Sequence, residues 1–284
     1  CSRHGAAWSA EASSLAGLSS ISQAISMVGT LDAVFNGGTD AFVAKVNSTG
    51  AAVTYSGYIG GSGIDEAYGI AVDGAGNTYV TGRTNSTETT FPETVGPDLT
   101  ANGGFDAFVA KINAAGSALN YAGFVGGSSD DEGFGIAVNS TGNAVITGRT
   151  TSNDASFSPA NAFDLTLGGT ADGFIAKVNP AGSALNFAGY LGGNGLEEGF
   201  GVAVIGLRQA FVTGRSTEAS FPTLLGPSLI FGGLSDAFVT RVEDNSVGCP
   251  TITIAPASLP VGAASTVYSQ QLTASGGAGG YVYS

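Results

Sequence analysis

The sequence predicts an all-β chain in which a four-stranded antiparallel unit is repeated about four times. First, an eight-residue phrase recurs at Asp40, Asp106, Asp172 and Asp236, reading DAFVAKVN, DAFVAKIN, DGFIAKVN and DAFVTRVE. Second, glycine supplies 46 of the 284 residues and charged residues only 11%, a composition that suits short strands joined by tight turns. Third, no helix-length periodic run separates the strand signals within the repeats.

The phrases start 66, 66 and 64 residues apart, and a fixed period of this length indicates an array of similar units. Four strand signals, which we call A to D, recur in each period. In the period after Asp65 they are Gly69–Asp73, Asn77–Arg83, Asp106–Ile112 and Ala118–Gly127. Turns rich in Gly and Asn join A to B and C to D, whereas B and C are joined by a long loop. Four antiparallel strands with these links predict a β-propeller blade.

Several of these segments resemble the bacterial β-propeller repeat called SBBP. They are GIAVDGAGNTYVTGRT, the Phe-Pro pairs at Phe91 and Phe221, DAFVAK and YAGFVGG. The resemblance covers about residues 15–247, and it implies a secreted or surface-exposed propeller with no defined reaction. The third unit departs at Phe157–Ala160, where a serine separates phenylalanine from proline.

Counting C strands predicts four blades, around residues 15–66, 67–132, 133–198 and 199–249, within a propeller domain at 1–249. The first blade begins weakly, because Gly17–Thr30 stands where the A and B strands stand later. We expect degenerate strands there, with SMVGT aligned to YVTGR before the C strand. The alternative is a helix, because apolar residues also recur there at helical spacing. These residues are Leu15, Leu18, Ile21, Ile25 and Val28.

The fourth blade lacks a D-strand signal after Asp236–Val242. Gly5–Ala10 is a candidate closing strand, with Trp8 in the position of Tyr121, because closing the ring removes exposed sheet edges. Cys1 and Cys249 would then fall in one link, where a disulfide would stabilise the ring by roughly 4–5 kcal/mol and would require an oxidising compartment. The alternatives are a lipid-modified Cys1, or a chain that is a piece of a larger ring.

Residues 250–284 change in composition and resemble the first part of a bacterial Ig-like domain, through LPVG, YSQQLTASGG and YVYS. Such sandwiches need about 100 residues, so these strands cannot form a two-sheet core alone. Either the segment is truncated, or its strands dock on the propeller or on a neighbouring subunit by strand addition.

Acidic pairs recur in the D–A loops, and an arginine ends each B strand on the same face of the propeller. The simpler interpretation is a repeated structural ion pair, because guanidinium and carboxylate match in geometry. The alternative is a cation- or sugar-binding face; Ca²⁺ needs six to eight oxygen ligands, and no compact loop of alternating Asp ligands is present. The residues are Asp65, Glu66, Asp131, Glu132, Glu197 and Glu198, with Arg83, Arg149 and Arg215.

The leading Asp of each phrase follows a Gly-containing turn, where its carboxylate can accept backbone N–H groups. Four copies at Asp40, Asp106, Asp172 and Asp236 indicate architecture rather than one active site. Basic residues at the other ends of the C strands are expected to be solvated and to protect edges. These are Lys45, Lys111, Lys177 and Arg241. The long B–C loops, at 84–105 and 150–171, are where we expect any recognition surface.

The formal net charge of −13 argues against nucleic acid as a partner, and no 18-residue apolar run predicts a membrane span. His4 is the only histidine, and no catalytic triad, zinc spacing or nucleotide-binding loop is present. The sequence therefore predicts a non-catalytic extracellular or cell-surface module for adhesion, scaffolding or assembly that needs no cofactor. A specific version is a filament subunit that self-associates through residues 250–284. The alternative is a carbohydrate-binding or carbohydrate-cleaving propeller that uses the long-loop face.

Overall fold

The computed structural model describes residues 7–9, 14–19, 32–153, 157, 164, 166–222, 229–244, 253–255 and 273–275. The chain divides into two compact units, Cys1–Asp244 and Asn245–Ser284, a boundary five residues before the one expected from composition. All the regular elements described are β-strands. None of the described residues form a helix that is long and apolar enough to cross a membrane.

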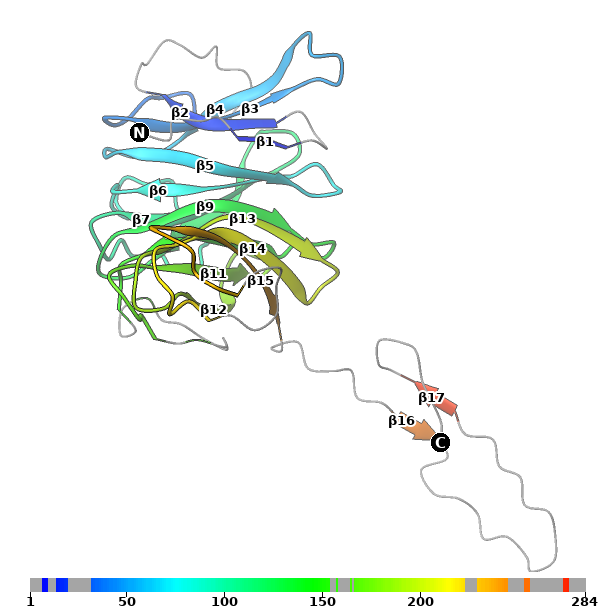
Figure 1. Cartoon of the computed structure of the whole chain (residues 1–284). Coiled ribbons are helices and arrows are strands. Elements are labelled where there is room, and N and C mark those ends of the chain that lie inside the picture. Colours follow the sequence, from blue (N-terminus) through cyan, green and yellow to red (C-terminus); the bar gives the residue numbers. More distant parts are fainter. Residues whose placement is uncertain are drawn as a thin grey trace, which may run out of the picture. The chain divides into compact units, whose positions relative to one another are not determined.

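The first unit consists of four antiparallel sheets that follow one another along the chain (Figure 1). Each sheet takes its strands in chain order, which is the arrangement of propeller blades, so we call the sheets blades one to four. Blade one holds β1 (Ala7–Ser9), β2 (Ser14–Ser19), β3 (Asp40–Val46) and β4 (Val53–Ile59). Blade two holds β5 (Asp65–Val72), β6 (Thr78–Thr84), β7 (Asp106–Ile112) and β8 (Leu119–Val125). Blade three holds β9 (Asp131–Val138), β10 (Ala144–Thr150), β11 (Asp172–Val178) and β12 (Leu185–Leu191), and blade four holds β13 (Glu197–Ile205), β14 (Gln209–Ser216) and β15 (Asp236–Glu243).

The short turns form because their residues supply their own hydrogen bonds. Between β5 and β6, the Asp73 carboxylate accepts the backbone N–H groups of Ala75 and Asn77 at 3.0 and 2.9 Å. Gly76 in that turn has a φ of 85°, a conformation that only glycine adopts at little cost. The turn between β7 and β8 repeats this chemistry with Asn113.

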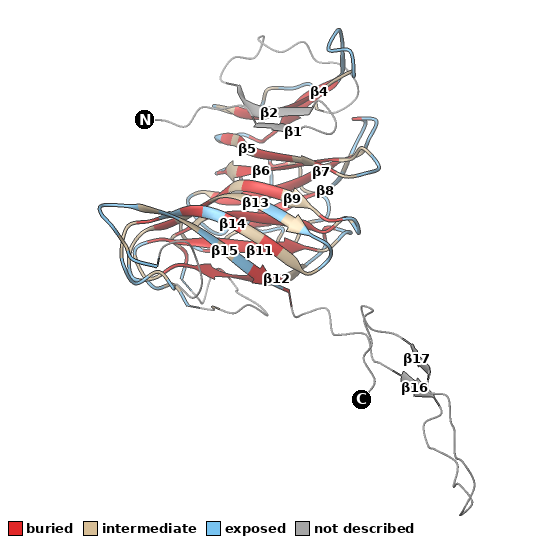
Figure 2. Cartoon of the chain, turned by 45° about the vertical axis from the view of Figure 1, so that its right-hand side comes forward, coloured by how far each residue is buried: buried red, intermediate tan, exposed pale blue. Residues whose placement is uncertain are grey.

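Neighbouring blades bury their sheet faces against each other. The apolar cluster between blades one and two includes Val43, Tyr55 and Phe108. The cluster between blades two and three includes Val109 and Phe174, and a third cluster joins blades three and four. Because blades two and three have a neighbour on each side, their B and C strands are buried on both faces, and they are mostly red in Figure 2.

The long B–C loops protect the outer edges of the first three sheets. In blade two, the carbonyls of Val95 and Asp98 accept the N–H groups of Ala122 and Phe124 in β8, both at 2.9 Å. Asp32 and Asp164 make the equivalent bond to the D strands of blades one and three, at 2.8 and 3.1 Å. An unpaired sheet edge invites association with other chains, so these loop segments have an architectural role.

The B strand of blade one lies earlier in the sequence than expected. β2 pairs with β3 so that Ser19 lies opposite Asp40, as Thr84 lies opposite Asp106 in blade two. Gly17 therefore occupies the position of Gly82, and the expected match of SMVGT to YVTGR is wrong. The physical reason is the loop: 20 residues separate the end of β2 from the start of β3, against 21 between β6 and β7 in blade two.

The expected closing strand belongs to blade one. β1, within the candidate segment Gly5–Ala10, pairs antiparallel with β2, and Trp8 lies opposite Leu15. It is therefore the A strand of blade one, and it does not complete blade four, whose described strands are β13, β14 and β15. The error arose because the B strand had been placed too late, which left Gly5–Ala10 without a place in blade one.

The second unit contains two short strands in its described residues. β16 (Thr253–Ala255) and β17 (Thr273–Ser275) pair antiparallel, with Ile254 opposite Ala274. Two three-residue strands do not identify an Ig-like sandwich, so that expectation stays a prediction.

Candidate functional site: the acidic and arginine-bearing face

The leading Asp of each C strand organises the end of the preceding loop. In all four blades its carboxylate accepts the backbone N–H group of the residue four positions earlier. The distances are 2.7 Å to Asp40, 2.9 Å to Asp106, 3.0 Å to Asp172 and 2.7 Å to Asp236. These carboxylates are therefore engaged with the backbone of their own blades.

The first acid of each D–A pair is buried at the junction between two blades. Asp65, Asp131 and Glu197 are each fully enclosed. Each accepts the N–H group of the residue four positions earlier, at 2.9, 2.7 and 3.1 Å. A serine hydroxyl donates a second bond, at 2.8 Å from Ser86 to Asp65 and from Ser152 to Asp131.

The leading Asp of one blade and the first acid of the next lie close together. A side chain added at Gly126 would meet the carboxylates of both Asp106 and Asp131. Burial, together with the nearby Asp131 carboxylate, raises the pKa of Asp106 to about 7. Burial also raises the pKa of Asp131 to about 6 and that of Asp172 to about 6. Two acids in one enclosed place favour a protonated form.

The second acid of each pair faces the arginine of the neighbouring B strand. Arg83 contacts Glu66 of its own blade at 2.7 Å and Glu132 of the next blade at 2.5 Å. Arg149 lies 4.0 Å from Glu132, so this carboxylate stands between two guanidinium groups. In blade four, Arg215 contacts Glu198 at 2.7 Å. The acidic and basic residues singled out on this face therefore interact with one another within and between blades.

A strip of aromatic side chains accompanies these ion pairs. The rings of Tyr68, Phe134 and Phe200 follow one another on β5, β9 and β13, with centroids 5.7 and 5.9 Å apart. The Tyr68 hydroxyl donates to Glu66, and all three rings are partly exposed. The sequence analysis missed this strip, although an aromatic residue at the same offset from each acidic pair, in DEAYG, DEGFG and EEGFG, was a signal for it.

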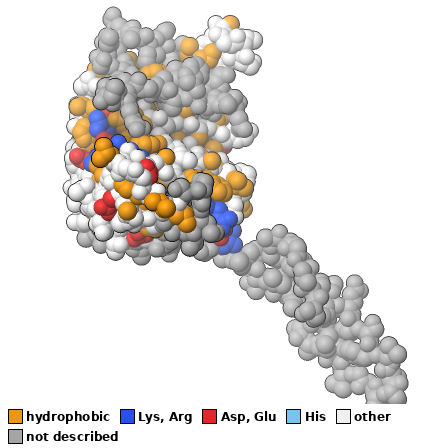
Figure 3. All heavy atoms as spheres, viewed as in Figure 1, with side chains coloured by type: hydrophobic (Ala, Val, Ile, Leu, Met, Phe, Trp, Pro, Cys, Tyr) orange, Lys and Arg blue, Asp and Glu red, His pale blue; other side chains and the backbone are white. Residues whose placement is uncertain are grey.

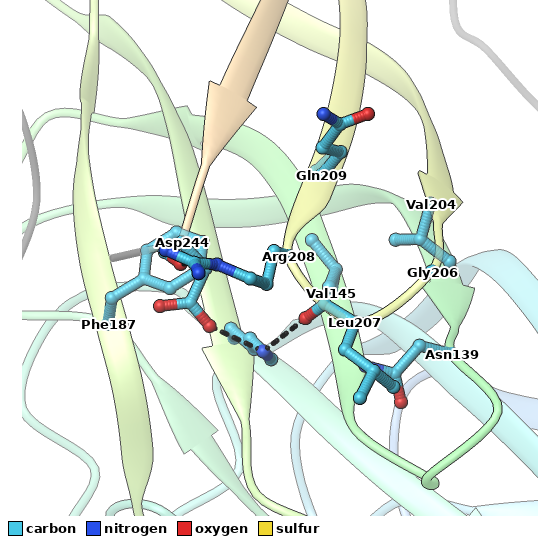
Figure 4. A pocket seen from close by; sticks show the side chains of 11 residues that line it. Asn139, Val145, Phe187, Val204, Gly206, Leu207, Arg208, Gln209 and Asp244 are labelled. Carbon is cyan, nitrogen blue, oxygen red and sulfur yellow. Dashed lines mark hydrogen bonds and ion pairs between the residues drawn. The ribbon is translucent and has the colours of Figure 1, made fainter. Parts of the chain in front are cut away.

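Lys177 corrects the expectation that the basic ends of the C strands are solvated. Its ammonium is buried between blades three and four, 2.5 Å from Asp244 and 3.0 Å from the Leu207 carbonyl (Figure 4). The residues around it form a small pocket that includes Phe187 and Arg208. The partner carboxylate lies just beyond β15, 67 positions along the chain. Lys45 and Lys111, at the equivalent positions, instead lie near the rings of Tyr55 and Tyr79.

This face shows no gathering of ligands for a metal ion. Within the described parts of the chain, no three His, Cys, Asp or Glu side chains come together in a way that could hold one. The two cysteines, Cys1 and Cys249, lie outside the described residues. The face therefore carries a row of ion pairs beside aromatic rings. Beneath them, buried acids accept backbone N–H groups of the loops.

Comparison with known proteins supports the repeat family. No curated protein matches the chain at a significant level. The family model described as a β-propeller repeat, SBBP, matches residues 54–88. That match runs from β4 of blade one through β5 and β6 of blade two, so the family's repeat unit crosses the junction at which Asp65 is buried. The match covers about half of one 66-residue period, and it supports the similarity of these repeats to the SBBP type of β-propeller repeat.

Proposed function

We propose that this chain is a non-catalytic β-propeller module of an extracellular or cell-surface protein, acting in adhesion, scaffolding or assembly. One observation carries the proposal: the repeated carboxylates are engaged as architecture. The leading Asp residues hold loop backbones, and the second acids of the pairs contact arginine. A reaction centre would need at least one such group to be directed at a substrate.

The extracellular location is a separate part of the proposal, and the cysteines test it. Peptide mass mapping of the unreduced native chain should find either a Cys1–Cys249 crosslink, which indicates an oxidising compartment, or a lipid mass on Cys1, which indicates a surface tether. Two free thiols would count against an extracellular location.

A specific version of the assembly role uses residues 250–284 to complete a neighbour's sheet. Sedimentation velocity on the full chain should then show concentration-dependent assembly, and deleting residues 250–284 should abolish it. The deleted segment lies wholly within the second compact unit, so circular dichroism of the shortened chain should still report the blades. A full chain that stays monomeric at all concentrations, with or without the deletion, would contradict this version.

The aromatic strip favours carbohydrate binding as the second candidate function. Partly exposed rings at 5.7 and 5.9 Å spacings beside carboxylates could stack on sugar rings and bond their hydroxyls. A glycan array should then give binding that is lost in Phe134→Ala and kept in Leu99→Ala, which removes an exposed loop side chain. No binding by the array and no turnover in a hydrolase screen would remove this candidate.

A further inference from the structure

The outer face of blade four exposes positions that every other blade buries. Val43, Val109 and Ile175 hold the same place in the C-strand phrase and are 0% exposed. Val239 holds this place in blade four and is 59% exposed. The same contrast separates Ala237, which is exposed, from Ala107, which is 0% exposed.

This place in the phrase is where each blade contacts the next one. Val43 packs in the cluster that contains Val80 and Phe108 of blade two. Val109 packs with Ile146 and Phe174 of blade three, and Ile175 packs with Val212 of blade four. Val239 therefore stands where a following blade would cover it.

The pattern extends over the whole of two strands. β11 is buried at every residue, whereas most of β15 alternates between exposed and partly buried positions. In Figure 2, β14 and β15 carry pale blue and tan stretches of exposed and partly buried residues, and Figure 3 shows apolar side chains gathered over the region of blade four. Among the residues whose burial the structure describes, eleven large apolar side chains are exposed, and six of them belong to blade four. They are Ile205, Leu207, Leu229, Ile230, Leu234 and Val239.

No blade of this chain supplies the cover among the described residues. Among the described strands, the extensive contacts between blades join blade one to two, two to three, and three to four, and no contact of similar extent joins blade four to blade one. Residues 245–284 do not repeat the C-strand phrase. The outer face of blade four thus carries the positions that form the other three inter-blade interfaces, but no described blade of this chain covers it.

The complementary surface is present at the opposite end of the series. In the first two interfaces the following blade contributes a Phe-x-Ala-x-Ile or Phe-x-Ala-x-Val row from its C strand, such as Phe174, Ala176 and Val178. In the third interface the corresponding positions of β15 include Phe238 and Val242. Blade one has the same row at Phe42, Ala44 and Val46. Phe42 and Val46 are only partly buried, whereas the matching residues of blades two and three are 0% exposed. These are Phe108, Ile112, Phe174 and Val178.

We propose that blade four docks, through Val239 and its neighbours on β14 and β15, onto blade one of a second copy of this chain. The contact rests on the proposed assembly role and gives it a defined surface. It is a head-to-tail contact, which closes into a ring if the rotation between copies allows and otherwise continues as a filament. Two copies would supply eight blades, within the usual range for propellers.

Sedimentation velocity under reducing conditions, over a wide range of protein concentration, tests this contact on the full chain. Wild type should form dimers or longer assemblies. Val239→Asp should shift the association midpoint at least tenfold towards higher concentration, because it buries a charge in the contact. Leu99→Asp is the matched control, since Leu99 is also exposed, at 42%, but lies in a blade-two loop. It should associate like wild type.

Mixing separates a head-to-tail contact from a symmetric one. A Val239→Asp chain keeps an intact blade one, so it should bind the blade-four face of a wild-type chain and cap it. A Val239→Asp variant that is folded by circular dichroism and still associates like wild type would overturn the inference. So would association lost on deleting residues 245–284 but insensitive to Val239→Asp, an outcome that leaves the proposed assembly role standing with the tail as its surface.

Discussion

Lys177 and Asp244 form an ion pair whose two partners are both almost fully enclosed. At a buried pair, removing one partner leaves an uncompensated charge, which costs far more than the pair itself contributes. The pair fastens β11 of blade three to the segment that follows β15 of blade four, so its loss should loosen the junction between these blades.

We therefore predict that Lys177→Met lowers the free energy of unfolding by about 3–5 kcal/mol, the usual cost of breaking a buried pair. Urea denaturation measures it. Lys177→Met combined with Asp244→Leu should recover much of the loss, because the double variant leaves no charge behind. Lys45→Met is the control at the same position of blade one. There the ammonium donates an exposed, 3.4 Å hydrogen bond to the Ala114 carbonyl, so this substitution should cost under about 1 kcal/mol. Equal losses at Lys45 and Lys177 would contradict the argument.

The buried acids at the blade junctions predict how stability depends on pH. Burial raises the pKa of Asp106 to about 7 and those of Asp131 and Asp172 to about 6. The unfolded chain has ordinary carboxyl pKa values near 4, so the folded chain binds more protons between about pH 4 and pH 7. The contribution of these three acids to stability is therefore greatest below this window and is lost as pH rises through it.

The melting temperature should accordingly be higher at pH 5 than at pH 8, and Asp106→Asn should flatten the difference because the amide cannot ionise. Differential scanning calorimetry across pH 4.5–8.5 measures both. Each unit of pKa shift corresponds to about 1.4 kcal/mol, so three raised acids together make an effect on the order of a few kcal/mol. A melting temperature that rises steadily from pH 5 to pH 8 would show that these acids are ionised and stabilised in the folded chain.

At the scale of single strands, the glycine in the TGR motif marks a bulge. β9 shifts register against β10 between Thr147 and Gly148. The Glu132 carbonyl oxygen consequently lies close to the Cα of Gly148, on the side where a side chain would begin. A methyl group at this glycine would meet that carbonyl and the Phe174 ring. A methyl group at the equivalent Gly82 or Gly214 would likewise meet the carbonyl of Glu66 or Glu198.

Gly148→Ala should lower the free energy of unfolding by about 1–3 kcal/mol, as overpacking in a filled interior does. Gly74→Ala is the matched control, because a methyl group there meets nothing within 4 Å, and it should be neutral or slightly stabilising. Chemical denaturation of both variants tests the prediction. It fails if the two substitutions have the same effect.

The elements that repeat were predictable, and those defined by partners far away in the sequence were not. The C strands and the Asp at their start follow directly from the four phrases. β2 was misplaced because SLAGLS shares little with TYVTGRT beyond the glycine and the final hydroxyl residue. The edge bonds from Val95 and Asp98 use backbone carbonyls, which leave no side-chain signal. Lys177 looked like its equivalents at Lys45 and Lys111, and only its partner beyond β15 makes it different.

At the scale of the whole molecule, the described strands of the first unit form a series in which the extensive contacts between blades join neighbouring blades. Each of the three apolar clusters spans one junction. In such a series, stability approximates a sum of blade and junction contributions. Blades two and three have a junction on each side, whereas the described residues of blade four have one.

Backbone amides should therefore exchange with solvent more slowly in β10 and β11 than in β14 and β15, because local opening is governed by buried contacts. Hydrogen exchange followed by mass spectrometry measures this in a dilute sample. If blade four docks on a second copy, raising the protein concentration should slow exchange in β14 and β15 and leave β10 and β11 unchanged, since these are already covered on both faces. In Val239→Asp the concentration effect should vanish while the difference between the blades remains. Equal protection of β11 and β15 in the dilute monomer would show instead that the outer face of blade four is stable without a cover, and the series would then need no further blade.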